Sequence, residues 1–247
     1  MPATSTSKRK NTPTWASRTE SLGYDPVDTL AAIGSLRAQV PVTVAPLVLV
    51  SQVYSIITSS TVVDREIDSL CKAGTLRRFR LGSGRHAVML MTDYLDQIRE
   101  TLTDLAELSQ RYSAFISSAT HDGVDITRAV LVDKIQTSDD DITELLKAGF
   151  LTHKSVDEYY ISARSIGVYW GSYIRGRQEL LLWLKRKQFR QVLQSLLEQK
   201  TLKQCLLPSK LILADLLGCG FVELVVTPMG NMIKLTRKAE EGASSSR

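Results

Sequence analysis

Positive side chains are concentrated in one stretch of this 247-residue chain, residues 164–210. The stretch holds ten Lys and Arg residues against two acids, Glu179 and Glu198, whereas the whole chain has a net charge of only +5. Cations without compensating acids bind the phosphates of a nucleic-acid backbone. We therefore expect a polyanion-binding site here, and its candidate residues are Arg175, Arg177, Lys185, Arg186, Lys187, Arg190, Lys200 and Lys203.

The same stretch predicts how such a site would read its ligand. Gln178, Gln188 and Gln191 are its only amide side chains placed to pair with base edges, so we expect backbone contacts with little sequence preference. An ordinary solvated helix face is the alternative, because Lys and Arg often serve only solubility.

A second basic group lies earlier in the chain. Arg78 and Arg80 fall on a predicted strand, and Arg85 falls in the turn that follows it. An arginine at such a tip can enter a minor groove or meet a phosphate, although an ordinary surface arginine is the default. The preceding helix carries three acids, Asp64, Glu66 and Asp68, which disfavours reading of a major groove by that helix.

Residue types that support catalysis are scattered. The histidines are far apart, at His86, His121 and His153, and the chain lacks a Walker lysine pattern and the H-R-D, D-F-G and A-P-E motifs of kinases. The glycine-rich turn at 82–87 leads into a predicted strand, so it has no helix N-terminus to hold a phosphate. We expect no catalytic residues, no cofactor and no enzyme activity.

The cysteines do not predict a metal site. Cys71, Cys205 and Cys219 are odd in number and have no paired metal-ligand spacing, so we expect reduced thiols and no metal. Reduced cysteines favour a cytosolic or nuclear protein. No apolar run reaches the roughly 18 residues that span a bilayer, and we expect no membrane association.

A phrase that occurs three times predicts the elements that carry these residues. Its copies are IDSLCKAGTL at 67–76, ITELLKAGFL at 142–151 and LADLLGCGFV at 213–222. In each copy an apolar-periodic helix ends at a glycine, which adopts a left-handed backbone without a Cβ clash. Alternating strands around a turn follow each glycine, and another short helix precedes each copy.

Two helices and a β-hairpin form a winged helix-turn-helix. We therefore predict a mainly α fold with small β-hairpins (α+β), built from three tandem winged helices, rather than three generic units without shared ancestry. The helices that open the units are predicted at 46–57, at 126–135 and at 192–197. A long helix over 169–184, continued or bent at 185–190, precedes the last of these.

The predicted units and tails differ in charge. Residues 1–24 form a basic disordered tail and 237–247 a second tail, and the winged helices occupy 25–100, 101–163 and 164–236. The middle unit carries 11 acids and 5 bases, which makes it a poor polyanion binder. In the first tail, the cluster Ser7–Lys10 is interpreted as a nuclear-import signal, a phosphate contact or a solvated tail.

Several short phrases resemble one known family. They are LVSQVYS from Leu49 to Ser55, TVVDR from Thr61 to Arg65, and GRQ from Gly176 to Gln178 in the long basic helix. Through these phrases and their order, the chain resembles the family called serine/threonine-protein kinase 19 from about residue 25 to residue 236. The resemblance implies tandem winged helices that bind double-stranded DNA and are not true kinases.

The resemblance further implies a nuclear, chromatin-associated role in transcription-coupled nucleotide excision repair. There the family bridges the stalled RNA polymerase II repair complex, including the Cockayne-syndrome ubiquitin ligase, to transcription factor IIH. By position it implies DNA contacts from Arg175, Arg177, Lys185, Arg186 and Arg190.

Three rival classes remain: a protein-binding scaffold without DNA affinity, an RNA-binding module and a kinase. The RNA class is disfavoured because Trp170, Tyr173 and Trp183 are interpreted as core residues. The sequence leaves open whether the protein forms a homodimer.

Overall fold

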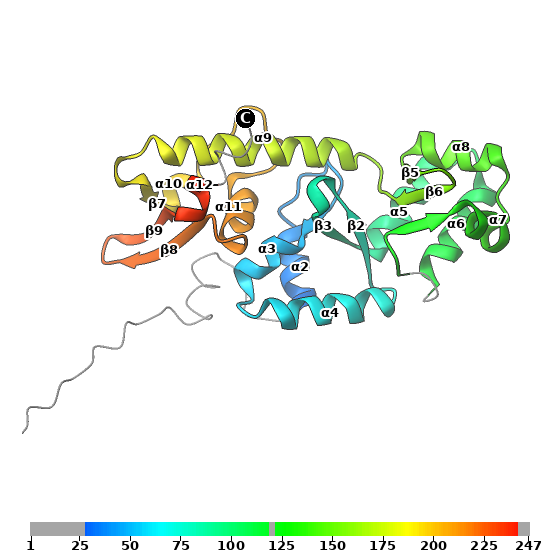
Figure 1. Cartoon of the computed structure of the whole chain (residues 1–247), viewed down its shortest axis with the longest axis horizontal. Helices are drawn as coiled ribbons and strands as arrows, with labels where there is room; N and C mark the ends of the chain where they lie inside the picture. Colours follow the sequence, from blue (N-terminus) through cyan, green and yellow to red (C-terminus); the bar gives the residue numbers. More distant parts are fainter. Residues whose placement is uncertain (1–27, 119–121, 242–247) are drawn as a thin grey trace, which may run out of the picture.

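The structure is a computed structural model that describes residues 28–118 and 122–241 (Figure 1). The tail over 1–24, the cluster Ser7–Lys10 and His121 lie outside the described residues. The described residues form three antiparallel sheets of three strands each. Each sheet belongs to one winged helix, so the predicted α+β class with winged helices is confirmed.

The three units repeat one order of elements. The first contains α2 (Thr29–Arg37), β1 (Val48–Leu49), α3 (Val50–Ile56), α4 (Ser60–Lys72), β2 (Leu76–Arg80) and β3 (His86–Leu90). The second contains α6 (Ala106–Ser117), β4 (Asp125–Thr127), α7 (Arg128–Ile135), α8 (Asp139–Ala148), β5 (Leu151–Ser155) and β6 (Glu158–Ile161). The third contains α9 (Ile166–Lys185), β7 (Gln191–Leu193), α10 (Gln194–Glu198), α11 (Ser209–Gly218), β8 (Val222–Thr227) and β9 (Gly230–Leu235).

Four further elements complete the described part of the chain. They are the 3-10 turns η1 (Gly82–Gly84) and η2 (Gln188–Arg190) and the helices α5 (Met91–Thr101) and α12 (Arg237–Glu241). The sheet orders are β1-β3-β2, β4-β6-β5 and β7-β9-β8, so the last strand of each unit is central in its sheet. Identical strand order in all three sheets supports one repeated domain.

The repeated glycines close their helices as predicted. Gly74, Gly149 and Gly220 have φ values of 70°, 84° and 70°. After each glycine the next backbone N–H donates to a carbonyl five residues back, at 2.8 to 3.0 Å. This bond satisfies a carbonyl that the helix end would leave unpaired, and it sets the direction of the hairpin that follows.

The structure differs from the sequence prediction at the start of each unit. Helices were expected from 46, 126 and 192, but a short strand comes first at each place, and the helices begin only at Val50, Arg128 and Gln194. The C-terminal tail also differs, since residues 237–241 form α12, where Ala239 is buried.

The first and third units pack directly on each other through α3 and α11. The two helices approach so closely that a Cβ added at Gly218 would lie 1.7 Å from the Ser51 carbonyl oxygen. Between α3 and α11, the Gln52 amide donates to the Leu211 carbonyl at 3.0 Å. The tight crossing therefore buries most of α11, the helix that ends in the third copy of the repeated phrase.

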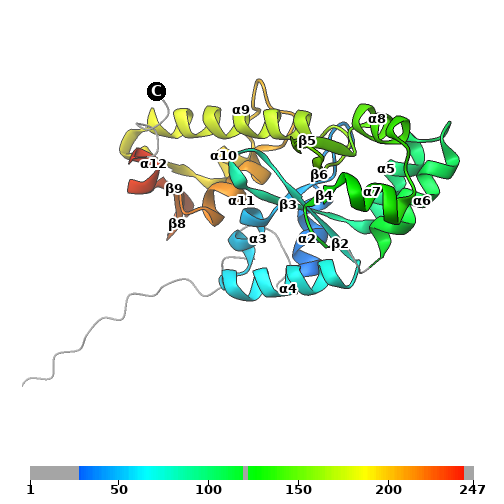
Figure 2. The same ribbon diagram turned by 45° about the vertical axis from the view of Figure 1, so that its right-hand side comes forward.

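Aromatic side chains join the first and second units. Tyr94 of α5 lies edge-on between Phe79 and Phe150, at centroid distances of 5.1 and 5.9 Å. Its hydroxyl donates to the Ser162 carbonyl at 2.8 Å. Figures 1 and 2 show α9 crossing one side of the molecule, from the second unit past β3 to the third unit. None of the described helices is long and apolar enough to cross a membrane.

Candidate nucleic-acid interface

The helix α9 positions most of the predicted cations. It buries one face, including Tyr169, Tyr173, Leu180 and Leu184, at the spacing of an amphipathic helix. The opposite face therefore points outward, and Arg175 lies exposed on it. Arg186 caps the C-terminal end of the helix and is also exposed.

A second segment, residues 199–208, crosses α9 and adds lysines. The crossing depends on Gly176, because a Cβ there would lie 2.4 Å from the Cys205 Sγ and 3.0 Å from its Cβ. The Cys205 side chain can pack against the helix backbone only because position 176 has no side chain. The approach brings Lys200 and Lys203 beside Arg175 and Arg186.

The two segments enclose a hollow that we call the basic groove. Its lining consists of Arg175, Gln178, Glu179, Leu182, Trp183, Arg186, Lys200, Lys203 and Gln204. Four cations and one acid line it, so the groove is positive and fits an anionic ligand. The structure thus brings together four of the cations that the sequence singled out.

Contacts within the groove hold the cations in place. The Lys200 ammonium lies 3.4 Å from Glu179 and 5.5 Å from the centre of the Trp183 ring. Glu179 also accepts from the Lys203 backbone N–H at 2.9 Å, and Arg175 donates to the Gln204 carbonyl at 3.1 Å. Fixed side chains lose less conformational entropy when they bind phosphate.

The cations after α9 lie on a turn. The sequence predicted that the basic run continues or bends the helix, and the helix in fact ends at Lys185. Lys187 then precedes η2, which contains Phe189 and Arg190. The Lys187 ammonium lies 4.6 Å from the centre of the Trp183 ring, so this turn is continuous with the basic groove.

Arg85 and Arg177 are held elsewhere, in the junction between the first and third units. Arg85 donates to Asp215 at 2.9 Å and to the Tyr173 hydroxyl at 2.5 Å. Arg177 lies 3.5 Å from the other oxygen of Asp215, and its guanidinium stacks on Phe221 at 4.3 Å. The sequence leaves Arg85 as a wing-tip contact to DNA or an ordinary surface arginine, whereas the structure packs this tip on the third unit.

The centre of this junction is the carboxylate of Asp215, which has no exposed surface. Ser51 and Tyr173 donate to it, each at 2.5 Å. Burial and the neighbouring Asp215 charge both raise the pKa of Tyr173. Burial has the largest single effect and lowers the pKa of Arg85, but Asp215, Tyr173 and Cys219 together outweigh it and raise that pKa. The junction therefore contains a charged, hydrogen-bonded network.

Arg78 and Arg80 lie away from the basic groove. Arg78 pairs with Asp68 of α4, so one of the three acids noted in the sequence is neutralised within the unit. Arg80 donates to the Tyr160 hydroxyl at 2.9 Å and stacks on that ring at 5.2 Å. Both arginines thus make internal contacts, and Arg80 links the first unit to the second.

The helices that would read a major groove are unsuited to it in the described structure. In the third unit α11 is buried against α3. In the second unit α8 begins with three acids, Asp139, Asp140 and Asp141, and in the first unit α4 exposes Asp64 and Asp68. Asp68, Asp139 and Asp141 pair with arginines of their own unit, whereas the charges of Asp64 and Asp140 repel the phosphates that flank a major groove. The basic groove is therefore the strongest candidate interface.

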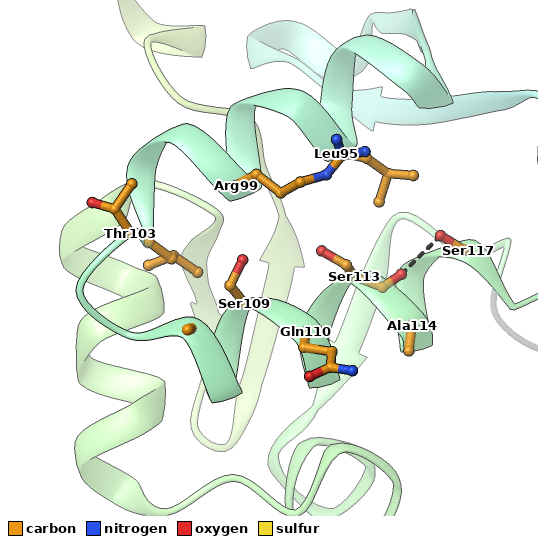
Figure 3. Close-up of a pocket in the computed structure, with 10 residues that line it drawn as sticks. Leu95, Arg99, Thr103, Ser109, Gln110, Ser113, Ala114 and Ser117 are labelled. Atoms are coloured by element: carbon orange, nitrogen blue, oxygen red, sulfur yellow. Dashed lines mark hydrogen bonds between the residues drawn. The ribbon is translucent and has the colours of Figure 1, made fainter.

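Another hollow, between α5 and α6, has a different character (Figure 3). Its lining is mostly apolar and small polar, with Leu95, Leu102, Ala106 and Ser113 among its members and Arg99 as its only ionisable side chain. Acid–base or nucleophilic chemistry needs paired ionisable groups, and the lining of this hollow does not contain such a pair. Within the described residues no three His, Cys, Asp or Glu side chains gather as a metal site.

Residues 26–235 match the sequence pattern of a family described as inactive serine-threonine protein kinase 19. The chain belongs to this family. The family's description as inactive agrees with the lack of kinase motifs in the sequence. The matched residues include all three winged helices.

Curated relatives carry a second description. The chain is 26% identical over 200 residues to winged helix repair factor 1 of Xenopus laevis, covering 78% of this chain and 76% of the relative. It is 26% identical over 195 residues to the Homo sapiens protein of that name, covering 77% and 76%. The Mus musculus protein is 25% identical over 195 residues, with the same coverage. The chain is thus related to winged-helix repair factors.

Sequence reasoning missed the roles of two residues of these sites. Trp183 packs partly against the core, as predicted, but it is only half-buried and lies between two lysines at the basic groove. Asp215 received no role, although a lone acid in the apolar run 211–217 was a signal for a buried partner.

Proposed function

We propose that this protein is a non-catalytic adaptor that binds the backbone of double-stranded DNA with little sequence preference. The observation that carries the proposal is the basic groove, in which α9 and the segment 199–208 place four cations on one surface. Lys187 and Arg190 extend that surface along the turn after α9. Lys185 adds charge at the end of the helix itself.

The lack of sequence preference follows from the acidic or buried recognition helices. Specific reading needs amide or guanidinium groups presented in the major groove. A groove of lysines and arginines beside the third unit makes phosphate contacts, which position a protein without identifying bases. We therefore expect binding in which the electrostatic contribution dominates.

The repair setting is the finer part of the proposal. The relatives are named repair factors, and the family resemblance implies a nuclear, chromatin-associated role in transcription-coupled nucleotide excision repair. We propose that the DNA-bound chain contacts the stalled RNA polymerase II repair complex, the Cockayne-syndrome ubiquitin ligase and transcription factor IIH. The acidic second unit, which faces no phosphate in this scheme, is available for protein partners.

The test is fluorescence-anisotropy binding to a random-sequence duplex across a salt series. The wild-type chain should bind at micromolar or lower concentration, with a log–log salt slope of about −4 to −7, as expected for five to eight phosphate contacts. The variant Arg186→Glu/Arg190→Glu should bind more than tenfold more weakly with a shallower slope, because each reversal replaces an attraction by a repulsion.

The matched control is Lys134→Glu/Lys147→Glu, which makes the same change of net charge in the second unit, where both lysines are exposed. It should bind almost as tightly as the wild type. Circular dichroism checks that all variants are folded. Equal binding by the two double variants would rule out the α9 end as the contact.

A protein scaffold without DNA affinity is the second candidate, favoured by the exposed acids of α4 and α8. It predicts no duplex binding even at low salt. In that case the basic groove would be the docking surface for an acidic protein.

A further inference from the structure

One large apolar side chain lies exposed in the middle of the cationic turn after α9. The Phe189 side chain is 74% exposed. Lys187 and Arg190 flank it, and Arg186 ends the helix just before it. Phenylalanine gains free energy on leaving water, so an exposed ring surrounded by cations requires an explanation.

The backbone holds this ring in an unusual conformation. Phe189 and Arg190 both have φ of 53°, the left-handed region that bulky residues seldom adopt. The turn is fixed on both sides: the Arg190 N–H donates to the Lys187 carbonyl at 2.9 Å, and Gln191 starts β7, paired with β9. Strained conformations that the surrounding structure maintains are concentrated at functional sites.

Two other highly exposed apolar residues have different surroundings. Met229 is 86% exposed at the tip between β8 and β9, and Val156 is 89% exposed beside Asp157 and Glu158. Phe189 alone among these three combines an aromatic ring with adjacent cations. Aromatic rings next to cations are the usual means of binding unstacked bases, because the ring stacks on the base and the cations hold the phosphates.

We propose that Phe189 stacks on an unpaired base of a DNA duplex whose stacking is interrupted, while Arg186 and Lys187 hold the flanking phosphates. The proposal rests on the proposed DNA binding and assigns it a structural preference. An intact duplex exposes no base face to the ring, and opening one costs unstacking energy. An unpaired base has already lost its pairing, so the stacking free energy appears as extra affinity.

The turn and the basic groove can act on one DNA molecule. Lys187 lies against Trp183, which lines the groove, so the phosphates beside the unpaired base continue toward Arg175 and Lys200. The groove then supplies affinity for any duplex, and Phe189 supplies the preference. This division of roles makes the two separable by mutation.

The test compares an intact duplex with the same duplex carrying one unpaired 2-aminopurine. The wild-type chain should bind the interrupted duplex about tenfold more tightly, as one base–aromatic stack provides. Binding should also quench the 2-aminopurine fluorescence. Phe189→Ala should lose both the preference and the quenching while binding the intact duplex unchanged, and Phe189→Trp should keep both.

Met229→Ala is the matched control, since it also removes an exposed apolar side chain from a turn of the third unit, and it should keep the preference. Equal wild-type affinity for the two duplexes, or an unchanged preference in Phe189→Ala, would overturn the inference alone. If Phe189→Ala lowered the affinity for both duplexes equally, the inference would also be overturned, because the ring would then contribute to binding without an unpaired base. Failure of the wild type to bind either duplex would instead overturn the proposed function.

Discussion

Asp215 shows how strongly one side chain can determine the relation between units. Its carboxylate is fully buried and lies within contact distance of Arg85 from the first unit and Arg177 from α9. A buried charge costs several kcal/mol of desolvation unless partners compensate it. Here the partners come from the first unit and from α9, so the network forms only when these elements pack correctly on α11.

Asp215→Ala should therefore destabilise the protein severely. The substitution leaves two partly buried guanidinium groups without their carboxylate, and losses of about 3–5 kcal/mol in the free energy of unfolding are typical of this change. Urea denaturation followed by circular dichroism measures it. Asp104→Ala removes an exposed carboxylate and serves as the control. A similar small loss in both variants would show that the junction does not depend on the network.

At this scale the sequence predicted charges but not their partners. Arg85, Arg177 and Arg175 are equivalent cations in the sequence, yet only Arg175 lies exposed in the basic groove. The two others meet an acid 130 and 38 residues away along the chain, respectively. Local patterning cannot predict such a contact, because it depends on how α3, α9 and α11 pack.

At the scale of elements, the sequence predicted the helices and hairpins that are marked by a glycine at the helix end. Each of the three phrases forms the predicted helix that ends at its glycine, and the predicted hairpin follows each glycine. The first strand of each unit was missed because it has only two or three residues, fewer than the four to eight that make alternation visible. Pairing with the last strand of the unit, rather than local propensity, stabilises it.

Gly176→Ala tests whether the crossing of α9 by residues 199–208 forms the basic groove. The added methyl would collide with Cys205, and such overpacking typically costs about 1–3 kcal/mol. To relieve the clash the segment must move off the helix, which separates Lys200 and Lys203 from Arg175. We expect a several-fold loss of duplex affinity in the anisotropy assay, at a concentration of folded protein confirmed by circular dichroism.

A second substitution distinguishes a displaced segment from general damage. Cys205→Gly removes both the Sγ and the Cβ that the methyl would meet, so the double variant should recover most of the affinity. Recovery of thermal stability without recovery of binding would contradict the assigned role of the crossing.

At the scale of the whole molecule, the three winged helices share their cores through buried tyrosines. Tyr94 and Tyr112 lie between the first two units, with their hydroxyls 3.2 Å apart. Tyr169 and Tyr173, on α9, pack at the junction of the first and third units and are fully buried. Because each junction buries aromatic side chains and polar hydroxyls, we expect the units to unfold together rather than one by one.

The tyrosines also predict how stability depends on pH. Burial raises the pKa of Tyr112 to about 12 and raises those of Tyr94, Tyr169 and Tyr173 above their ordinary value. In the unfolded chain these hydroxyls ionise near pH 10. A raised pKa in the folded state contributes stability that is fully present below pH 10 and is lost as the pH rises through the folded value.

The protein should therefore unfold cooperatively in alkali, at a pH above about 10, and the buried phenolates should appear only with that transition. Parallel titrations of phenolate absorbance and of helical circular dichroism measure the two events. The phenolate absorbance of these buried side chains should rise in a step that coincides with the loss of helix. If all tyrosines ionised in one step near pH 10 with the helices intact, these side chains would be accessible to water, and a core shared by the three units would be excluded.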